Sequence, residues 1–407
     1  MIFPADLSLL SLDDDVVAFS ESAQCLLRLN ASAALVISRW RNGASVSELA
    51  GILASEGHVA PQEAEPWVTA TLGAFRASGL FGDERRSGPA SSAGAEDAGD
   101  VPAEAHGLPP YSPFEPAMER RYRLLETCAL VRFGSMAQVR LVNSVIGHLG
   151  TDDKCAPTTI IDIRAEMLAD GHLRSDVYND RLPVGCAPKL SRLGPIVKSA
   201  LWQSAINAHD FLFYIHAGVV ATDEGCIVLP ATAGSGKSSL TAALVHHGFR
   251  YFSDEVALIE PATFRVPPMP LATCVKSTGW DVMAPYFPEI LLLPVHLRGD
   301  AKIVRYVPPP PGRVGRRPLP ISHIIFPKYD ENAATTLVGV ERAAALGRLM
   351  GECLAMRRRL DITNVQALID WIGGVSCHDL TFSSLDAATR LVVEATGCEA
   401  SVWHTHC

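Results

Sequence analysis

Apolar and polar positions in the first eighty residues change from a strand pattern to a helix pattern. The apolar runs at 16–20 and 25–29 predict two short strands joined by a turn. Apolar residues then recur at helical spacing in three windows, at 30–40, 45–57 and 67–79, each closed by a glycine. We therefore expect a small unit of two strands and three helices, similar to a winged helix.

The rest of the chain, from about residue 114, alternates strand-like and helix-like stretches. Apolar runs at 129–133, 158–163 and 211–220 predict strands. The windows 344–354 and 385–395 have helical spacing instead. Because strands and helices interleave, we expect an α/β domain.

Between these two parts lies a segment without large aliphatic residues. Residues 85–112 consist almost wholly of Ala, Gly, Ser, Pro, Asp and Glu, so they bury too little apolar surface to offset the entropy of ordering. The sequence therefore predicts an N-terminal domain at 1–84, a flexible linker at 85–112 and a larger domain at 113–407.

Composition excludes several classes of protein. The net charge of −9 disfavours a nucleic-acid binder, which needs clustered Lys and Arg. No uninterrupted apolar run is long enough to span a membrane, and residues 1–10 lack the features of a signal peptide. The ten cysteines contain no C-x-x-C pair, so we expect buried thiols in a reducing cytoplasm.

The segment Cys226–Leu240 carries the most specific signal in the chain. A short apolar run enters a glycine-containing loop that ends in Gly-Lys-Ser and opens a helix, the order in which phosphate-binding loops are built. Ala231 stands where the motif has its first glycine, and alanine lacks only the freedom of positive φ. The residues predicted to bind the nucleotide are Ala233, Gly234, Ser235, Gly236, Lys237, Ser238 and Ser239.

Two adjacent acids follow the loop, in the stretch RYFSDEVALIE. Asp254 and Glu255 lie seventeen and eighteen residues after Lys237, inside a run of apolar residues. Buried carboxylates are costly unless they meet a cation or a proton donor. An exposed pair on an edge strand is the alternative. In the functional interpretation, one acid helps to hold Mg²⁺ and the other accepts the proton of an attacking hydroxyl.

With both motifs in place, residues 215–260 resemble the catalytic core of the HPr serine kinase family, in particular the HPr-kinase-related enzymes. That family has a His-Gly-type strand, a phosphate loop, a helix ending in glycine and an acidic pair. Here these features read HAG at 216–218, the loop at 231–238, HHGF at 246–249 and the acids at 254–255. The likeness extends more weakly over about 115–400 and implies a fold shared with phosphoenolpyruvate carboxykinases.

The resemblance also implies roles for individual residues, with ATP and Mg²⁺ as cofactors. Lys237 would bind the phosphates and Ser238 the Mg²⁺. Asp254 would be the general base, and Glu255 would act on the Mg²⁺ side, directly or through water. His216 stands where the family has a histidine near the transferred phosphate, although a histidine in an apolar strand is also an ordinary core residue.

The first eighty residues resemble the PqqD-like domains, which serve as recognition elements for peptide precursors. The stretches LLRLNASAALVISRW, ASVSELAGILASEG and WVTATLGAFRASGLF stand where that family has its three helices. A DNA-reading helix-turn-helix is the alternative. The second helix, however, has no Lys or Arg between Ser45 and Gly57 with which to contact phosphates or bases.

Three further candidates are less specific. Lys276 could reach the phosphates or be an ordinary solvated lysine. The stretch 307–320, with Arg313, Arg316 and Arg317, could be a mobile basic loop that closes over the nucleotide or an acidic peptide. His404, His406 and Cys407 form a possible but weak metal cluster at the terminus.

These signals predict an ATP-dependent kinase. We expect it to phosphorylate a hydroxyl, that of a serine, on a ribosomally made peptide or protein bound by the N-terminal domain. One alternative is a kinase for a carrier protein or small molecule. Another is a non-catalytic, nucleotide-gated peptide-binding protein. A homo-oligomer is compatible with each of these three functions.

Overall fold

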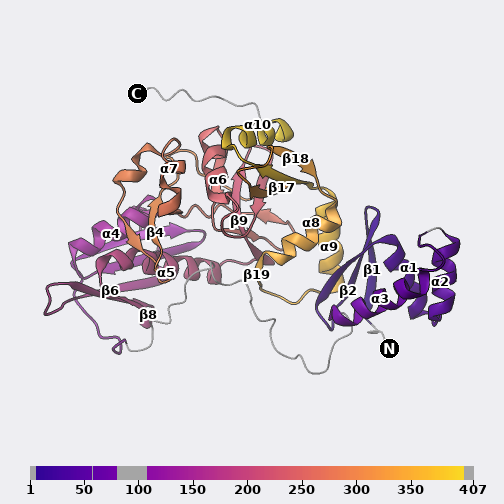
Figure 1. Cartoon of the computed structure of the whole chain (residues 1–407). Helices are drawn as coiled ribbons and strands as arrows, with labels where there is room; N and C mark the ends of the chain where they lie inside the picture. Colours follow the sequence, from indigo (N-terminus) through magenta and orange to yellow (C-terminus); the bar gives the residue numbers. More distant parts are fainter. Residues whose placement is uncertain (1–5, 57, 80–107, 398–407) are drawn as a thin grey trace. The chain divides into compact units, whose positions relative to one another are not determined.

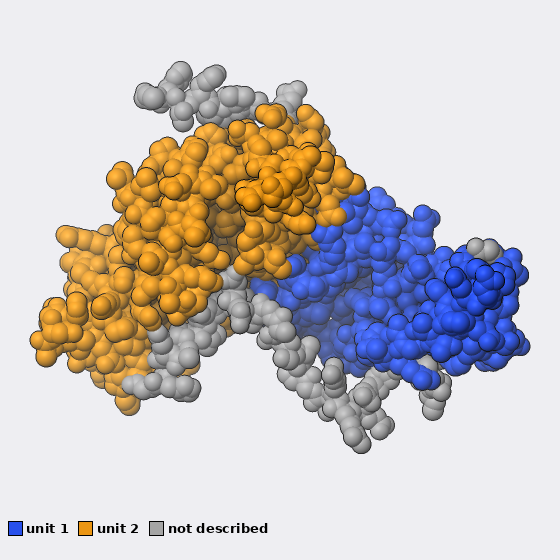
Figure 2. Space-filling view, in the orientation of Figure 1, with its two compact units in different colours: residues 1–93, 339–378 blue, residues 94–338, 379–407 orange. Residues whose placement is uncertain are grey.

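The described part of the chain is divided between an N-terminal region and an α/β region. The computed structural model describes residues 6–56, 58–79 and 108–397 (Figure 1). Unit 1 comprises Met1–Ala93 with Gly339–His378, and unit 2 comprises Gly94–Val338 with Asp379–Cys407 (Figure 2). This division differs from the predicted domains, because unit 1 also takes a segment from late in the chain. Most of the predicted linker, 85–107, lies outside the described residues.

Unit 1 contains a three-stranded antiparallel sheet in the order β1-β2-β3. Its elements are β1 (Leu7–Leu12), β2 (Asp15–Ser20), β3 (Cys25–Leu29), α1 (Ala31–Arg41), α2 (Val46–Ser55) and α3 (Ala64–Ala77). The predicted strands and helices are confirmed, but the expectation of only two strands is wrong. LSLLSL at Leu7–Leu12 has no clean alternation, and its pairing with β2 makes it a strand.

The late segment of unit 1 packs against the same sheet. It forms α8 (Arg342–Gly351), β19 (Cys353–Met356) and α9 (Ile362–Gly373). Helix α8 contacts β2 and β3, and α9 contacts β1. The Gln24 side chain donates to Leu360 O at 2.7 Å and accepts from Leu360 N at 2.9 Å, which fixes the β2–β3 turn. The helix predicted at 344–354 is wrong at its end, because it stops at Gly351 and residues 353–356 form a strand.

Unit 2 opens with a five-stranded sheet in the order β4-β5-β6-β7-β8. The strands are β4 (Met118–Leu124), β5 (Thr127–Phe133), β6 (Thr159–Met167), β7 (Leu173–Asn179) and β8 (Leu182–Ala187). Helices α4 (Met136–Ile146) and α5 (Leu193–Ala208) pack against this sheet and against each other. The predicted strands at 129–133 and 158–163 are confirmed as β5 and β6.

A larger sheet follows, in the order β11-β9-β10-β17-β20-β18, with β12 paired to β9 and β13 to β17. Its strands are β9 (Phe213–Ala221), β10 (Cys226–Pro230), β11 (Arg250–Ser253), β12 (Val256–Ile259), β13 (Arg265–Val266), β17 (Leu319–Tyr329), β18 (Thr336–Gly339) and β20 (Ser376–Phe382). Helices α6 (Lys237–His246) and α10 (Leu385–Thr396) share a buried apolar cluster with β9, β10, β17 and β20. The expectation of an α/β domain is confirmed.

A small third sheet completes unit 2, in the order β14-β16-β15. It consists of β14 (Thr273–Lys276), β15 (His296–Leu297) and β16 (Ile303–Val307), with the short helix α7 (Trp280–Met283) after β14. Single 3₁₀ turns occur at Gly147–Leu149, Leu190–Arg192, Ser277–Gly279 and Pro288–Leu292. Within the described residues, no helix is long and apolar enough to cross a membrane.

The basic stretch at 307–320 is tied to the large sheet. Arg313 O accepts from Tyr251 N at 2.7 Å, and Arg313 Nη1 donates to Gly248 O at 3.1 Å. A Cβ at Gly315 would lie only 2.2 Å from the Phe252 ring, so the backbone passes directly over that ring. These contacts contradict the expectation of a mobile loop.

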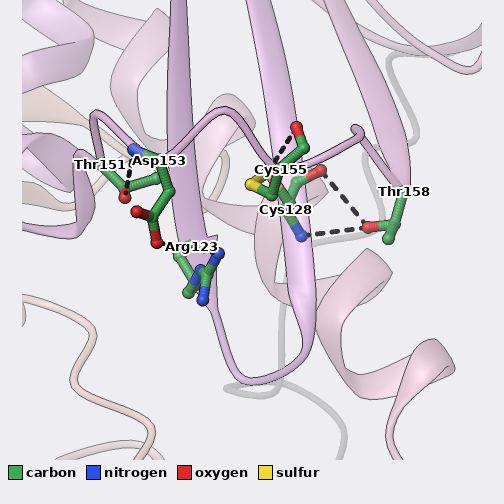
Figure 3. The surroundings of a disulfide bond; sticks show 6 residues. All are labelled: Arg123, Cys128, Thr151, Asp153, Cys155 and Thr158. Carbon is green, nitrogen blue, oxygen red and sulfur yellow. Dashed lines mark hydrogen bonds and ion pairs between the residues drawn. A yellow bond between two sulfur atoms is a disulfide. The ribbon is translucent and has the colours of Figure 1, made fainter.

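One pair of cysteines departs from the expectation of free thiols. Cys128 on β5 and Cys155 in the loop before β6 form a disulfide, beside which Thr158 Oγ1 accepts from Cys128 N and donates to Cys128 O (Figure 3). Six other described cysteines are free. The terminal group at 404–407 lies outside the described residues.

Candidate active site

A cavity of about 710 Å³ in unit 2 brings the predicted site residues together. It is lined by the phosphate loop and the start of α6, the β11–β12 junction, β14 and the first residues of α10. The residues of the loop, the acidic pair and the histidine of β9 all line it: His216, Ala233, Gly234, Ser235, Gly236, Lys237, Ser238, Ser239, Asp254 and Glu255. The structure thus places these residues around one space, while their individual roles remain predictions.

The phosphate loop runs from the end of β10 to the first turn of α6. Gly234 (φ 90°) and Gly236 (φ 84°) take left-handed backbone conformations that favour glycine. A Cβ at Gly236 would lie 2.6 Å from the Phe382 ring, so β20 closes over the loop, and Tyr329 N donates to Ser235 O at 3.0 Å. Ala231 has no positive φ, which explains why alanine is accepted at the first glycine of the motif.

Helix α6 approaches β9 closely because Gly218 of β9 has no side chain. A Cβ at Gly218 would lie 2.5 Å from Thr241 Oγ1 and 3.3 Å from Lys237 Cγ. Lys237 is buried at the first position of α6, and its Nζ donates to the backbone oxygen of Asp254 at 2.6 Å. The loop lysine and the acidic pair are therefore already in contact.

The acidic pair lies where pairing along β9 is interrupted. β11 pairs with β9 up to Ser253, and β12 resumes the pairing at Val256. Ser253 Oγ accepts from Glu255 N at 3.3 Å and from Val256 N at 3.2 Å, which stabilises the irregular backbone. An interruption of this kind redirects side chains out of the alternating pattern of a strand. It explains how Asp254 and Glu255, adjacent in sequence, both line the cavity.

Asp254 is buried beside the loop, with an exposed fraction of 4%. Burial raises its pKa to about 6, although the charge of Lys237 and the nearby Ser238 hydroxyl act to lower it. Its Oδ1 atom is buried and has no hydrogen-bond partner. A carboxylate with a raised pKa and an oxygen that has no hydrogen-bond partner is suited to accept a proton.

Glu255 has a different environment. Its carboxylate forms an ion pair with Lys198 of α5, a residue that sequence analysis missed. Burial acts to raise the pKa of Glu255, but the charge and hydrogen bond of Lys198, with weaker effects of Lys237 and Arg298, hold it below the ordinary value. The only sequence signal for Lys198 is a charged residue inside the apolar window LGPIVKSALW.

The wall formed by the small sheet adds cations that stand apart from the motifs. Lys276 at the end of β14 lines the cavity, and its contact with phosphates stays a prediction. Arg298 after β15, which sequence analysis missed, also lines the cavity. Arg298 Nη1 lies 3.9 Å from Cys274 Sγ, and its Nε lies 3.4 Å from Asp300 Oδ1. None of Arg313, Arg316 and Arg317 lines the cavity.

The donor set fits a nucleotide with its Mg²⁺ better than a metal held by protein alone. No group of three or more His, Cys, Asp or Glu side chains is placed to hold a metal in the described ranges. Mg²⁺ usually binds one or two protein oxygens together with phosphate oxygens and water. Ser238 and Glu255, which sequence analysis assigned to Mg²⁺ and which both line the cavity, provide such a partial set.

Comparisons with known proteins give matches among solved structures alone. No family model matches the chain, and no curated protein matches it. Among solved structures, the chain is similar to the Hpr(Ser) kinase/phosphatase from Coxiella burnetii, with 15% sequence identity and a TM-score of 0.22. The match covers 45% of this chain and 95% of that one.

Proposed function

We propose that this chain is an ATP-dependent kinase that phosphorylates a hydroxyl, on serine by preference, of a ribosomally made peptide or protein. The observation that carries the proposal is the pairing of the loop with Asp254. Asp254 accepts a hydrogen bond from the loop lysine at its backbone oxygen, and its buried carboxylate, at one wall of the cavity, has an oxygen without a hydrogen-bond partner. A protein that only binds nucleotide has no need for a base at this point.

In this proposal the residues of the chain divide the work of phosphoryl transfer. ATP with Mg²⁺, when bound, supplies the phosphoryl group and charge neutralisation. The loop amides and the Lys237 ammonium bind the phosphates, and the N-terminus of α6 adds its dipole. Asp254 orients the acceptor hydroxyl and takes its proton at Oδ1.

Unit 1 supplies the peptide site in the same proposal. β2 is the central strand of its sheet, so β1 and β3 are edge strands that can pair with an extended peptide. β3 lies beside the end of α3, where Cys25 Sγ donates to Ser78 O at 3.5 Å. A peptide added to β3 would gain backbone hydrogen bonds from the strand and side-chain selectivity from the neighbouring helix.

The test of the kinase is transfer from γ-labelled ATP to peptides encoded beside its gene, with Mg²⁺ and the full chain. Label on a peptide hydroxyl, lost in Lys237→Ala and Asp254→Asn, is the expected result. Label on a small molecule or carrier protein instead would refute the peptide substrate and keep the kinase. Tight ATP binding without any transfer would favour the nucleotide-gated binding protein.

The test of peptide delivery compares peptides rather than truncated proteins. Deleting 1–84 would remove the sheet that α8 and α9 contact, so loss of activity there would have a trivial cause. With the full chain, a precursor with its leader should have a KM at least about tenfold lower than the same peptide without it, because tethering raises the local substrate concentration. Equal KM values would contradict delivery by unit 1.

A further inference from the structure

Lys198 occupies an unusual place for a lysine. It lies on α5, the helix that covers the five-stranded sheet, among buried apolar neighbours on the same helix, and only 7% of it is exposed. A buried ammonium is costly unless it is paired. Its Nζ pairs with Glu255 Oε1 and lies 5.4 Å from the centre of the Tyr306 ring.

The two partners of this ion pair differ in their access to the cavity. Glu255 lines the cavity, and its side chain is 30% exposed, whereas Lys198 is not among the lining residues. Lys198 therefore lies behind Glu255, where it contacts neither the loop nor the space in front of it. Lys198 therefore meets the cavity through the Glu255 carboxylate, and its charge also acts to lower the pKa of Asp254.

We propose that Lys198 is a positioning residue that engages one oxygen of Glu255 and so divides the acidic pair into two roles. Asp254 keeps an open oxygen beside the loop. Glu255 has Oε1 paired with Lys198, which leaves its other oxygen outside the ion pair for a water or hydroxyl in the cavity. This inference rests on the proposed kinase function and adds how the second acid of the site is held in position.

The arrangement also explains why the second acid is a glutamate. Asp254 lies against α6, and its backbone oxygen accepts from Lys237. The next side chain must reach across to α5, on the five-stranded layer, to meet Lys198. Glutamate has one methylene more than aspartate for that reach. The pair Lys198–Glu255 thereby joins the layer of the five-stranded sheet to the layer of the phosphate loop.

The experiment compares Lys198→Met, Lys198→Arg, Glu255→Gln and the double variant Lys198→Met/Glu255→Gln, with Lys189→Met as an exposed control. Nucleotide affinity is measured by calorimetry, and kcat and KM by phosphotransfer. Lys198→Met should leave the affinity for ATP within about threefold, because the loop and Lys237 are unchanged, and it should lower kcat at least about tenfold, because it releases Glu255. Lys198→Arg should recover most of the lost kcat, since it keeps the charge.

Non-additivity is the second readout. In the Lys198→Met background, Glu255→Gln should cause little further loss of kcat, because the carboxylate has already lost its anchor. If Lys198→Met does not fold, the double variant removes both charges and still allows the comparison with Glu255→Gln alone. Urea unfolding is measured for the wild type, Lys198→Met, Glu255→Gln and the double variant. The midpoint shift of the double variant should be smaller than the sum of the shifts of the two single variants.

Three results would overturn the proposal. A loss of ATP affinity as large as that of Lys237→Ala would make Lys198 a nucleotide contact. An unchanged kcat in folded Lys198→Met would make the pair merely structural, and additive urea shifts would show that no pair forms. The calorimetric and urea results stand even if the wild-type chain transfers no phosphate, so failure of the kinase proposal is separable from failure of this one.

Discussion

The two sides of the cavity are built in different ways. The phosphate side comes from one continuous segment, in which β10, the loop and the start of α6 follow each other along the chain. The opposite side is assembled from the β11–β12 junction and the β14–β15 region, and its ion pair with α5 behind it joins residues 57 positions apart. Local backbone geometry makes the first side, and tertiary packing makes the second.

The difference shows which kind of chemistry each side can perform. Phosphates are bound by backbone amides, and consecutive residues with two left-handed glycines suffice to present them. Proton transfer is favoured by a carboxylate with a shifted pKa, and burial and charges contributed by distant segments produce such shifts. Asp254 obtains its raised pKa from such burial, while the adjacent Glu255 is held low by Lys198.

The largest expected effect breaks the assembled side alone. Asp254→Asn keeps size and polarity but cannot accept a proton, so phosphotransfer should fall by about 10²–10⁴-fold while ATP binding persists. Single-turnover transfer and calorimetry on the same preparation check both parts. A normal rate in this variant would remove Asp254 from the role of base.

The next effect breaks the continuous side alone. Lys237→Ala removes a charged donor to the phosphates, and affinity for ATP with Mg²⁺ should fall by about 10–100-fold, the range of a charge-assisted hydrogen bond. Calorimetry on a variant with wild-type circular dichroism provides the measurement. Unchanged affinity would contradict the assignment of the loop.

A third prediction concerns the cost of burying Asp254. Its folded pKa of about 6 lies above the unfolded value, so the folded protein binds more protons in the window from about 4 to 6. Wild-type stability should therefore lose up to about 3 kcal/mol from this group as pH rises through that window, and Asp254→Asn should lose nothing. The stability of the variant relative to wild type should rise between pH 4 and pH 7.

Urea unfolding of the two proteins without nucleotide, with EDTA present, measures that difference. A gap between them that is the same at pH 4 and pH 7 would show that Asp254 has an ordinary pKa in the folded protein.

The smallest effect tests the tolerance of the loop. Ala231→Gly should change ATP affinity by less than about threefold, because residue 231 has no positive φ that glycine alone would favour. The same calorimetric titration applies. A gain of tenfold or more would mean that alanine strains the loop.

Unit 1 shows how far local pattern carries a fold. The helices α1 to α3 follow from apolar periodicity and from caps such as Asn30 and the Ser45–Glu48 box, all formed within a few residues. Strand β1 was missed because only its pairing with β2 makes it a strand. The partnership with α8 and α9 was missed because it joins residues more than 300 positions apart, such as Arg342 and Asp13. The resemblance of this region to peptide-recognition domains stays a prediction.

The sequence by itself determined the phosphate loop, helix α6 and the place of the two acids, because each is encoded by neighbouring residues whose types have few other uses together. Only the tertiary structure decided the surroundings of each acid. Asp254 is buried beside Lys237 and has a carboxylate oxygen without a hydrogen-bond partner. Glu255 is paired with Lys198, which comes from another layer. The physical reason is that burial and ion pairing depend on segments brought together by folding, and no local pattern records which segments those will be.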